Sequence, residues 1–206
     1  MTKSTSTDPI KMPKGLIHFY LIQILSKIAF SIFAPLTAVY VIALGGSVLN
    51  LGELLALFGV LNSVASYLIA KTGDKYKYIS LPVSAGLFVI YSLTLFLINS
   101  VDEFYFAICF GGFASAMIRP SRRGIPLDFI DHKLYIIFEQ KKVMFLSMVG
   151  AASAYLGAKI IHHSGNSAPH ESQDITTFKY IFMISLIINS IVFIYSLVFF
   201  RKYNRS

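Results

Sequence analysis

The sequence predicts an all-α membrane protein, built as a bundle of six transmembrane helices. The first reason is composition: charged residues make up only 14 % of the 206 residues and the mean hydropathy is +0.67, whereas soluble domains carry roughly 25 % charged residues. A soluble domain of this length has too much surface to hide so many apolar side chains. The second reason is the order of the chain, in which long apolar segments alternate with short polar ones.

Six apolar segments are each long enough to cross a bilayer, which takes about 20 residues for a hydrocarbon core of roughly 30 Å. They form one transmembrane domain, 15–200, between a polar lead, 1–14, and a polar tail, 201–206. No short apolar run with a small-residue cleavage site follows the lead, so we expect no signal peptide. The predicted spans are about 16–44, 51–70, 79–98, 104–118, 143–161 and 178–200.

Two local features are expected within this division: a kink in the first span and a short helix outside the spans. Pro35 lies inside the first span and is expected to kink it, because proline removes a backbone donor. The longest polar connection, 119–142, separates the fourth and fifth spans, and we expect a short interfacial helix around 134–139.

The distribution of lysine and arginine predicts the orientation. All but three of the 18 basic residues fall in the lead, the tail, the second-to-third loop or the fourth-to-fifth loop. Cytoplasmic loops carry this excess in membrane proteins. We therefore expect both termini on the cytoplasmic side of the plasma membrane, which is the inner membrane if the source is a bacterium. Because the basic residues sit in loops between apolar segments, the net charge of +8 does not indicate nucleic acid.

Lys27 is the clearest candidate for a functional side chain, since it lies near the middle of the first span. An ammonium at that depth costs at least about 2.5–3.5 kcal/mol. Gln23, Lys27 and Ser31 follow at helical spacing and so share one face, which predicts a watery substrate cavity. The alternative is a structural lysine bonded to backbone carbonyls or another helix. A positive cavity wall favours anionic or carbonyl-bearing ligands.

Two spans carry stripes of small residues at helical spacing, which allow helix backbones to approach closely in lipid. The stripes have two interpretations: tight packing within the six-helix unit, or contact with a second six-helix unit. The members are Gly52, Ala56, Gly59 and Ser63 in the second span, and Gly150, Ala154 and Gly157 in the fifth.

Catalytic, metal and cofactor sites are not expected. The sequence has no phosphate-binding glycine loop after a strand and no hydrolase triad spacing, so we expect no enzyme and no cofactor. Histidines gather only at 162, 163 and 170, near Glu171. Because adjacent histidines cannot both face one ion from a helix, this loop is a poor metal site. Cys109 is the only cysteine, so the chain holds no internal disulfide.

Several short motifs follow one another along the chain. The first span ends in Pro-Leu-Thr-Ala-Val-Tyr at 35–40, and Leu-Gly-Gly-Ser at 44–47 precedes the second span. The loop at 70–77 contains Ala70, Asp74 and Lys75, and Arg119-Pro120 closes the fourth span. Together these motifs resemble the N-terminal half of a major facilitator superfamily transporter. The signature of that family is Gly-x-x-x-Asp-Arg/Lys; Asp74 and Lys75 match it, and Ala70 replaces its first glycine. The resemblance covers about residues 15–200.

This resemblance implies transport of a small solute by alternating access between two six-helix halves. It also implies a conformational latch, in which Asp74 and Lys75 meet the basic groups Arg119, Arg122 and Arg123. The fourth span lacks the embedded arginine of proton-coupled members and the fifth lacks the Gly-Pro of antiporters, so proton coupling is not implied.

The family has twelve helices and this sequence has six, so the resemblance implies a partner. The second and fifth helices face the other half in the family. We therefore expect a homodimer or a second six-helix chain, besides the lipid bilayer. The alternative is a membrane protein that does not transport: an assembly or regulatory subunit, or a truncated, inactive half-transporter.

Overall fold

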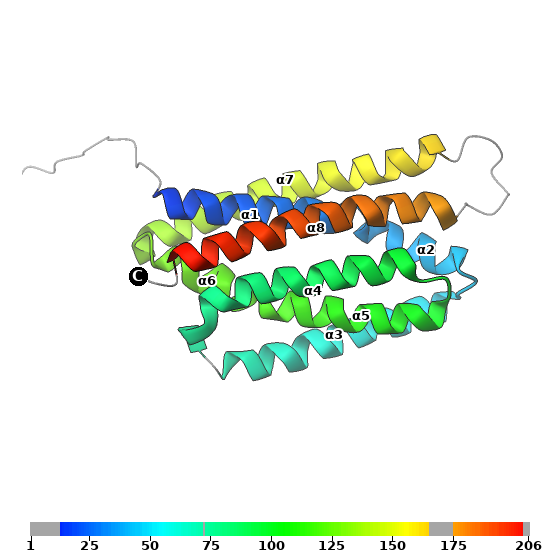
Figure 1. Cartoon of the computed structure of the whole chain (residues 1–206), viewed down its shortest axis with the longest axis horizontal. Helices are drawn as coiled ribbons and strands as arrows, with labels where there is room; N and C mark the ends of the chain where they lie inside the picture. Colours follow the sequence, from blue (N-terminus) through cyan, green and yellow to red (C-terminus); the bar gives the residue numbers. More distant parts are fainter. Residues whose placement is uncertain (1–12, 72, 165–174, 204–206) are drawn as a thin grey trace, which may run out of the picture.

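A computed structural model describes residues 13–71, 73–164 and 175–203, and within these ranges the regular structure is entirely helical (Figure 1). The elements are α1 (Lys14–Ser31), η1 (Ala34–Leu36), α2 (Thr37–Ala43), α3 (Val48–Ala70), η2 (Gly73–Tyr76), α4 (Lys77–Leu97), α5 (Val101–Met117), α6 (Arg119–Leu127), α7 (His132–Ser164) and α8 (Ile175–Tyr203).

Six stretches of the described chain are long and apolar enough to cross a membrane. They are Lys14–Ala43, Val48–Ala70, Lys77–Leu97, Val101–Leu127, Leu134–His162 and Ile175–Tyr203. The predicted set of six apolar helices is therefore confirmed, and the chain is a multi-pass membrane protein. Large apolar side chains remain exposed along every one of these stretches, as expected of helices that contact lipid.

The first and fourth spans are both interrupted next to a proline. In the first, α1 ends at Ser31 and Pro35 lies in the short 3-10 turn η1, where the Leu36 amide donates to Phe33 O instead of continuing the α-helical pattern. In the fourth, Ile118 separates α5 from α6, and Pro120 stands in the first turn of α6. Proline has no amide hydrogen and clashes with the preceding turn, which explains both interruptions.

The connection predicted between the fourth and fifth spans is largely helical. α6 covers its first part, and α7 runs without interruption from His132, so 134–139 belongs to the long helix rather than to a separate interfacial one. The segment 132–142 contains no glycine or proline, and its leucine, glutamate, glutamine and lysine residues are good helix formers. Its polarity, which suggested a loop, is compatible with a helix that begins outside the apolar layer.

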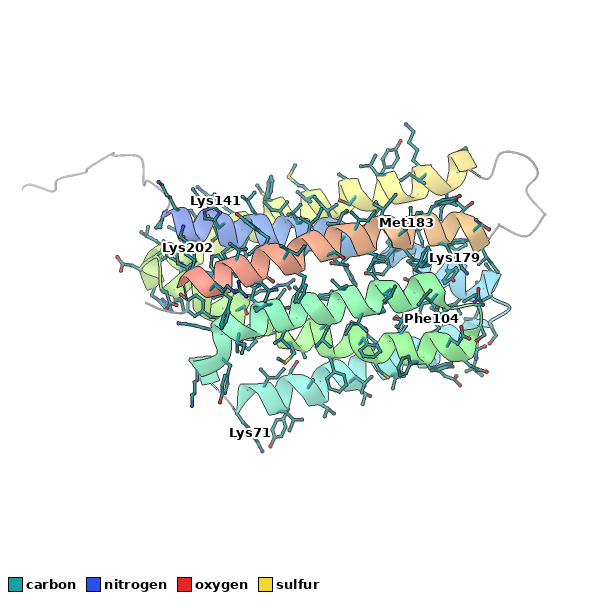
Figure 2. The ribbon with its side chains drawn as sticks, viewed as in Figure 1. Lys71, Phe104, Lys141, Lys179, Met183 and Lys202 are labelled. Carbon is teal, nitrogen blue, oxygen red and sulfur yellow. The ribbon has the colours of Figure 1, made fainter. Side chains whose placement is uncertain are left out.

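The helices pack as a bundle in which the start of α1 and the end of α8 lie at the same end (Figure 1). The most extensive contact joins α4 and α8; α3 packs on α5, α4 on α5, and α1 on both α8 and α7. Lys71, Lys141 and Lys202 lie toward the end of the bundle that holds the start of α1 and the end of α8, whereas Lys179 lies toward the other (Figure 2). The bundle therefore has one strongly basic end.

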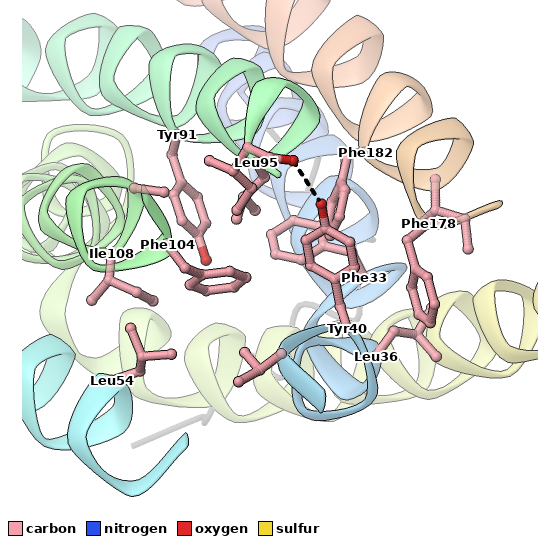
Figure 3. Close-up of a cluster of buried hydrophobic side chains, with 14 of the residues drawn as sticks. Phe33, Leu36, Tyr40, Leu54, Tyr91, Leu95, Phe104, Ile108, Phe178 and Phe182 are labelled. Carbon is pink, nitrogen blue, oxygen red and sulfur yellow. Dashed lines mark hydrogen bonds between the residues drawn. The ribbon is translucent and has the colours of Figure 1, made fainter. Parts of the chain in front are cut away.

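Two buried apolar clusters fill the bundle, one toward each end. In the cluster away from the basic end, the Tyr40 ring meets Phe182 at 4.9 Å between centroids and Phe178 at 5.2 Å, and its hydroxyl donates to Ile98 O (Figure 3). The other cluster includes Leu16, Phe19 and Phe199.

A layer of polar contacts crosses the bundle between the two clusters. Asn189 Nδ2 of α8 donates to Ser92 Oγ of α4 at 2.8 Å, and Ser185 Oγ of α8 donates to Ala29 O of α1 at 2.9 Å. These side chains are buried. The layer joins α1, α4 and α8 through hydrogen bonds in the interior, where no water competes for them.

Candidate functional site

A polar cavity of about 380 Å³ lies among α1, α4, α5, α6 and α7. It extends from Lys27, roughly 20 Å along α1 from Lys14 at ~1.5 Å per residue, toward the basic end of the bundle. Phe30 and Phe88 supply apolar wall. The polar and charged side chains that line it are Gln23, Ser26, Lys27, Ser115, Arg122, Glu139, Lys142 and Ser147.

The cavity wall carries three cations and one carboxylate. Lys142 Nζ lies 2.5 Å from Glu139 Oε2, one helical turn earlier on α7, and the Lys142 side chain is only 9 % exposed. Lys27 and Arg122 have no ion pair within 4.0 Å among the residues that the structure describes. The formal charges of the wall therefore sum to +2.

Lys27 reaches the cavity because α7 has a glycine opposite it. A methyl group built on Gly150 would lie 2.6 Å from Lys27 Cε and 3.2 Å from Ser31 Oγ. The absence of a side chain at Gly150 leaves room for the methylene stem of Lys27. Gln23 and Lys27 of the predicted cavity face line the cavity, while the buried Ser31 lies beside it, against Gly150.

Gln23 is the least satisfied polar side chain of the cavity wall. It is 2 % exposed, and within the described chain neither its Oε1 nor its Nε2 has a hydrogen-bond partner. A buried polar group without a partner costs about 1–3 kcal/mol. An amide in this condition on a cavity wall is available to a ligand, since it can both donate and accept hydrogen bonds.

The residues of the predicted latch divide between two places. Asp74 and Lys75 lie in η2, which packs on α6, the helix of Arg119, Arg122 and Arg123. The side chain of Asp74 lies outside the described part of the structure. Arg122 faces the cavity, whereas Arg119 and Arg123 line a separate groove of about 460 Å³ against Ser66, Tyr67, Ile69 and Ala70 of α3.

A different acidic residue joins the start of α4 to the end of α6. Asp128 Oδ1 lies 2.5 Å from Lys77 Nζ, and Asp128 Oδ2 accepts a hydrogen bond of 2.7 Å from Tyr78 OH. Ser121 Oγ of α6 also donates to Lys77 O at 2.6 Å. No spacing rule could have paired Asp128 with Tyr78, which lies 50 positions away along the chain.

The two small-residue stripes have different surroundings. On α3, Gly52, Ala56, Gly59 and Ser63 are exposed, and a methyl group built on either glycine would meet no atom within 4 Å. On α7, Gly150 and Gly157 are buried against α1 and Ala154 is half-buried. A methyl group on Gly157 would overlap Ile32 O. The stripe on α7 is therefore occupied within the unit, and the stripe on α3 is open.

Two charged residues of the cavity, Glu139 and Lys142, were missed by the sequence-based prediction because they fell in the supposed polar connection. Their signal was present in the spacing: 139, 142, 143, 146 and 147 follow the pattern i, i+3, i+4, i+7, i+8, which places them on one helical face. The absence of helix breakers from 132 to 142 would have extended the fifth helix to include them.

Comparison with known proteins assigns no family. A scan of the chain against protein-family models finds no match, and a search of the curated proteins finds none either. For metals, no group of three histidine, cysteine, aspartate or glutamate side chains comes together in the described ranges; residues 170 and 171 of the histidine-containing loop lie outside them. The fold and site define a multi-pass membrane protein with a cationic cavity inside its helix bundle.

Proposed function

We propose that this chain is one six-helix unit of a transporter that moves a small solute by alternating access, together with a second six-helix unit. The observation that carries the proposal is the cavity: a polar, positively charged space lined by residues of five helices of an apolar bundle. Charged side chains in membrane spans are costly, and they commonly mark the path of a substrate or an ion. Lys27 and Gln23 are retained in this space without partners in the described chain.

The helix packing supports a relationship to one half of the major facilitator fold, which contains two inverted three-helix repeats. If the two repeats are equivalent, spans 1, 2 and 3 correspond to spans 4, 5 and 6. The contact of α3 with α5 (spans 2 and 4) then corresponds to that of α7 with α1 (spans 5 and 1). The contact of α4 with α5 (spans 3 and 4) corresponds to that of α8 with α1 (spans 6 and 1), and the contact of α4 with α8 (spans 3 and 6) corresponds to itself. All five contacts are present.

The two proline-interrupted spans also correspond to each other in the two repeats. Pro35 and Pro120 each fall about 20 residues after the start of their span, in spans 1 and 4. Proline-interrupted segments at corresponding positions of two repeats point to a binding site between them. Both interrupted spans contribute lining residues to the cavity.

The orientation follows from the basic end of the bundle. With that end in the cytoplasm, as the positive-inside rule requires, both termini are cytoplasmic and the cavity lies between Lys27 and the cytoplasmic face. In the alternating-access cycle this would be the inward-facing cavity, and the second unit would supply its opposite wall. The connection η2 and the arginines of α6 would act as the latch between states.

Uptake of labelled solutes into liposomes tests the proposal for every charge class. Liposomes that contain the full chain are offered radiolabelled anionic, cationic and neutral small molecules, and we expect protein-dependent uptake with one class. Lys27→Met should remove this uptake. The matched control is Lys159→Met, because Lys159 is an exposed lysine of α7 outside the cavity.

Two outcomes would refute the transport proposal. One is the absence of uptake with every solute, while the liposomes contain folded, oligomeric protein by native mass measurement. The other is an uptake that is the same in Lys27→Met as in the wild-type protein. Either result would favour a role as an assembly or regulatory subunit.

A further inference from the structure

We propose that the ligand of the cavity is a small dianion whose two negative charges lie on oxygen atoms. The proposal rests on the proposed function, since it names the class of solute for the same cavity. Its basis is the combination of charge, donor geometry and size at the wall, together with the unpaired buried amide of Gln23.

The first argument is charge balance. Lys27, Arg122 and Lys142 supply three positive charges and Glu139 supplies one negative charge, so the wall carries +2. Charges that are partly withdrawn from water inside a helix bundle are costly unless they are paired. A dianion neutralises the wall, a monoanion leaves one positive charge over, and a cation increases the imbalance.

The second argument is the kind of donor that each cation provides. Arg122 carries a planar guanidinium, whose paired N–H groups match the two oxygens of a carboxylate or phosphate. Lys27 is a point charge on a flexible stem and lies on a different helix, α1. Because Arg122 and Lys27 come from separate helices, they suit a ligand with its charge distributed over several oxygens, rather than a single atom.

The third argument is the remainder of the wall. Gln23 offers one unpaired carbonyl and one unpaired NH₂ group, which suits a hydroxyl or carbonyl elsewhere on the ligand. Phe30 and Phe88 suit a short carbon backbone. The volume of about 380 Å³ is near the lower limit for small-molecule pockets, roughly 300–1,000 Å³. Dicarboxylates and phosphate monoesters both meet these requirements.

Replacement of Glu139 should strengthen the binding of a dianion, whereas the loss of a cation should weaken it. Its carboxylate lies 2.5 Å from Lys142 Nζ and so competes with an anionic ligand for that lysine. Glu139→Gln should release Lys142 and raise the formal charge of the wall to +3. A dianion should then bind several-fold more tightly. A cationic ligand would respond in the opposite way and lose its main partner.

Equilibrium binding to the purified full chain in lipid nanodiscs tests the inference. The probes are succinate as a dicarboxylate, glycerol 3-phosphate as a phosphate monoester, lactate as a monoanion and choline as a cation, each titrated by calorimetry. We expect one of the two dianions to bind at least about tenfold more tightly than lactate or choline. Succinate binding identifies the dicarboxylate class, and glycerol 3-phosphate binding identifies the phosphate class.

The variants separate a specific site from general attraction to a basic protein. Lys27→Gln, Arg122→Gln and Gln23→Leu should each weaken dianion binding, the first two by about tenfold or more, while Lys159→Gln leaves it unchanged. Thermal unfolding of each variant verifies that it is folded, and Lys27→Met serves as a second variant at that position.

Three results would overturn the inference: neither dianion binds, choline binds best and Glu139→Gln abolishes its binding, or dianion affinity is the same in folded Lys27→Gln and Arg122→Gln as in the wild-type protein. The outcome is independent of transport. Dianion binding without uptake of any solute refutes the proposed function alone, and uptake only of cations or neutral solutes refutes the dianion alone.

Discussion

Replacement of Gly157 by alanine should separate α7 from the end of α1. A methyl group at Gly157 would lie 3.1 Å from the Ile32 carbonyl carbon and far inside the contact distance of Ile32 O. Both are backbone atoms, so no side chain can rotate away to make room. Carbon atoms pack at about 3.5–4.0 Å, and α7 must therefore move outward by about 1 Å.

The size of the effect follows from two opposing terms. Overpacking of this kind costs about 1–3 kcal/mol, while alanine in place of glycine within a helix gains up to about 1 kcal/mol. Because the overlapped atoms belong to the backbone, the cost falls in the upper half of that range, and the expected net loss is about 1–2 kcal/mol. Gly59 provides the matched control, because a methyl group there meets no atom within 4 Å. Gly59→Ala should therefore be neutral or slightly stabilising within the unit.

The stability of both variants can be compared by reversible unfolding in mixed micelles. Circular dichroism follows the loss of helix as the mole fraction of dodecyl sulfate rises. Gly157→Ala should unfold at a lower mole fraction than the wild-type protein, and Gly59→Ala at the same or a higher one. Equal unfolding of the two variants would refute the close packing of α7 on α1. A stable Gly157→Ala protein with the wild-type midpoint would do so equally.

Three further substitutions use the same unfolding measurement. Asn189→Leu removes the hydrogen bond to Ser92 between α4 and α8 and should cost about 1–2 kcal/mol; an unchanged midpoint would mean that the polar layer adds no stability. Ser47→Ala removes the side-chain cap of α3 and should cost about 0.5–2 kcal/mol, with Ser47→Gly costing less; the reverse order would contradict a capping role. Asp128→Asn weakens the ion pair with Lys77, in which the Lys77 side chain is 20 % exposed and the Asp128 side chain is 34 % exposed. The loss of stability should be less than about 1 kcal/mol; a larger loss would mean that this pair contributes much of the stability.

The number and approximate position of the spans could be predicted from the sequence because each depends on a local property. Lipid offers no hydrogen-bond partner to the backbone, so an apolar run of sufficient length must be helical. The break at Pro35 in the first span is also local, because proline removes a backbone donor at its own position. The start of α7 could not be inferred from hydropathy, because the polar turns around Glu139 are helical without being apolar.

The site was predictable only in part, because it depends on which helices meet. Lys27 and Gln23 share a helical face, which periodicity reveals. Glu139 and Arg122 reach the same cavity from other helices, and no spacing rule relates them to α1. The pairing of Asp128 with Lys77 is non-local in the same way. For the glycines, spacing identified the stripes but not their neighbours.

The difference between the two stripes bears on how a second unit would pack against this one. Gly157 is already in contact with α1, so α7 offers an incoming helix its larger side chains: Met144, Met148 and Tyr155 recur at helical spacing and are exposed. α3 offers the open glycines 52 and 59. In a two-fold symmetric dimer the same surface appears on both subunits. If the axis sets α3 of one copy against α7 of its partner, each small stripe receives a row of large side chains. Such a contact is self-complementary and would be made twice.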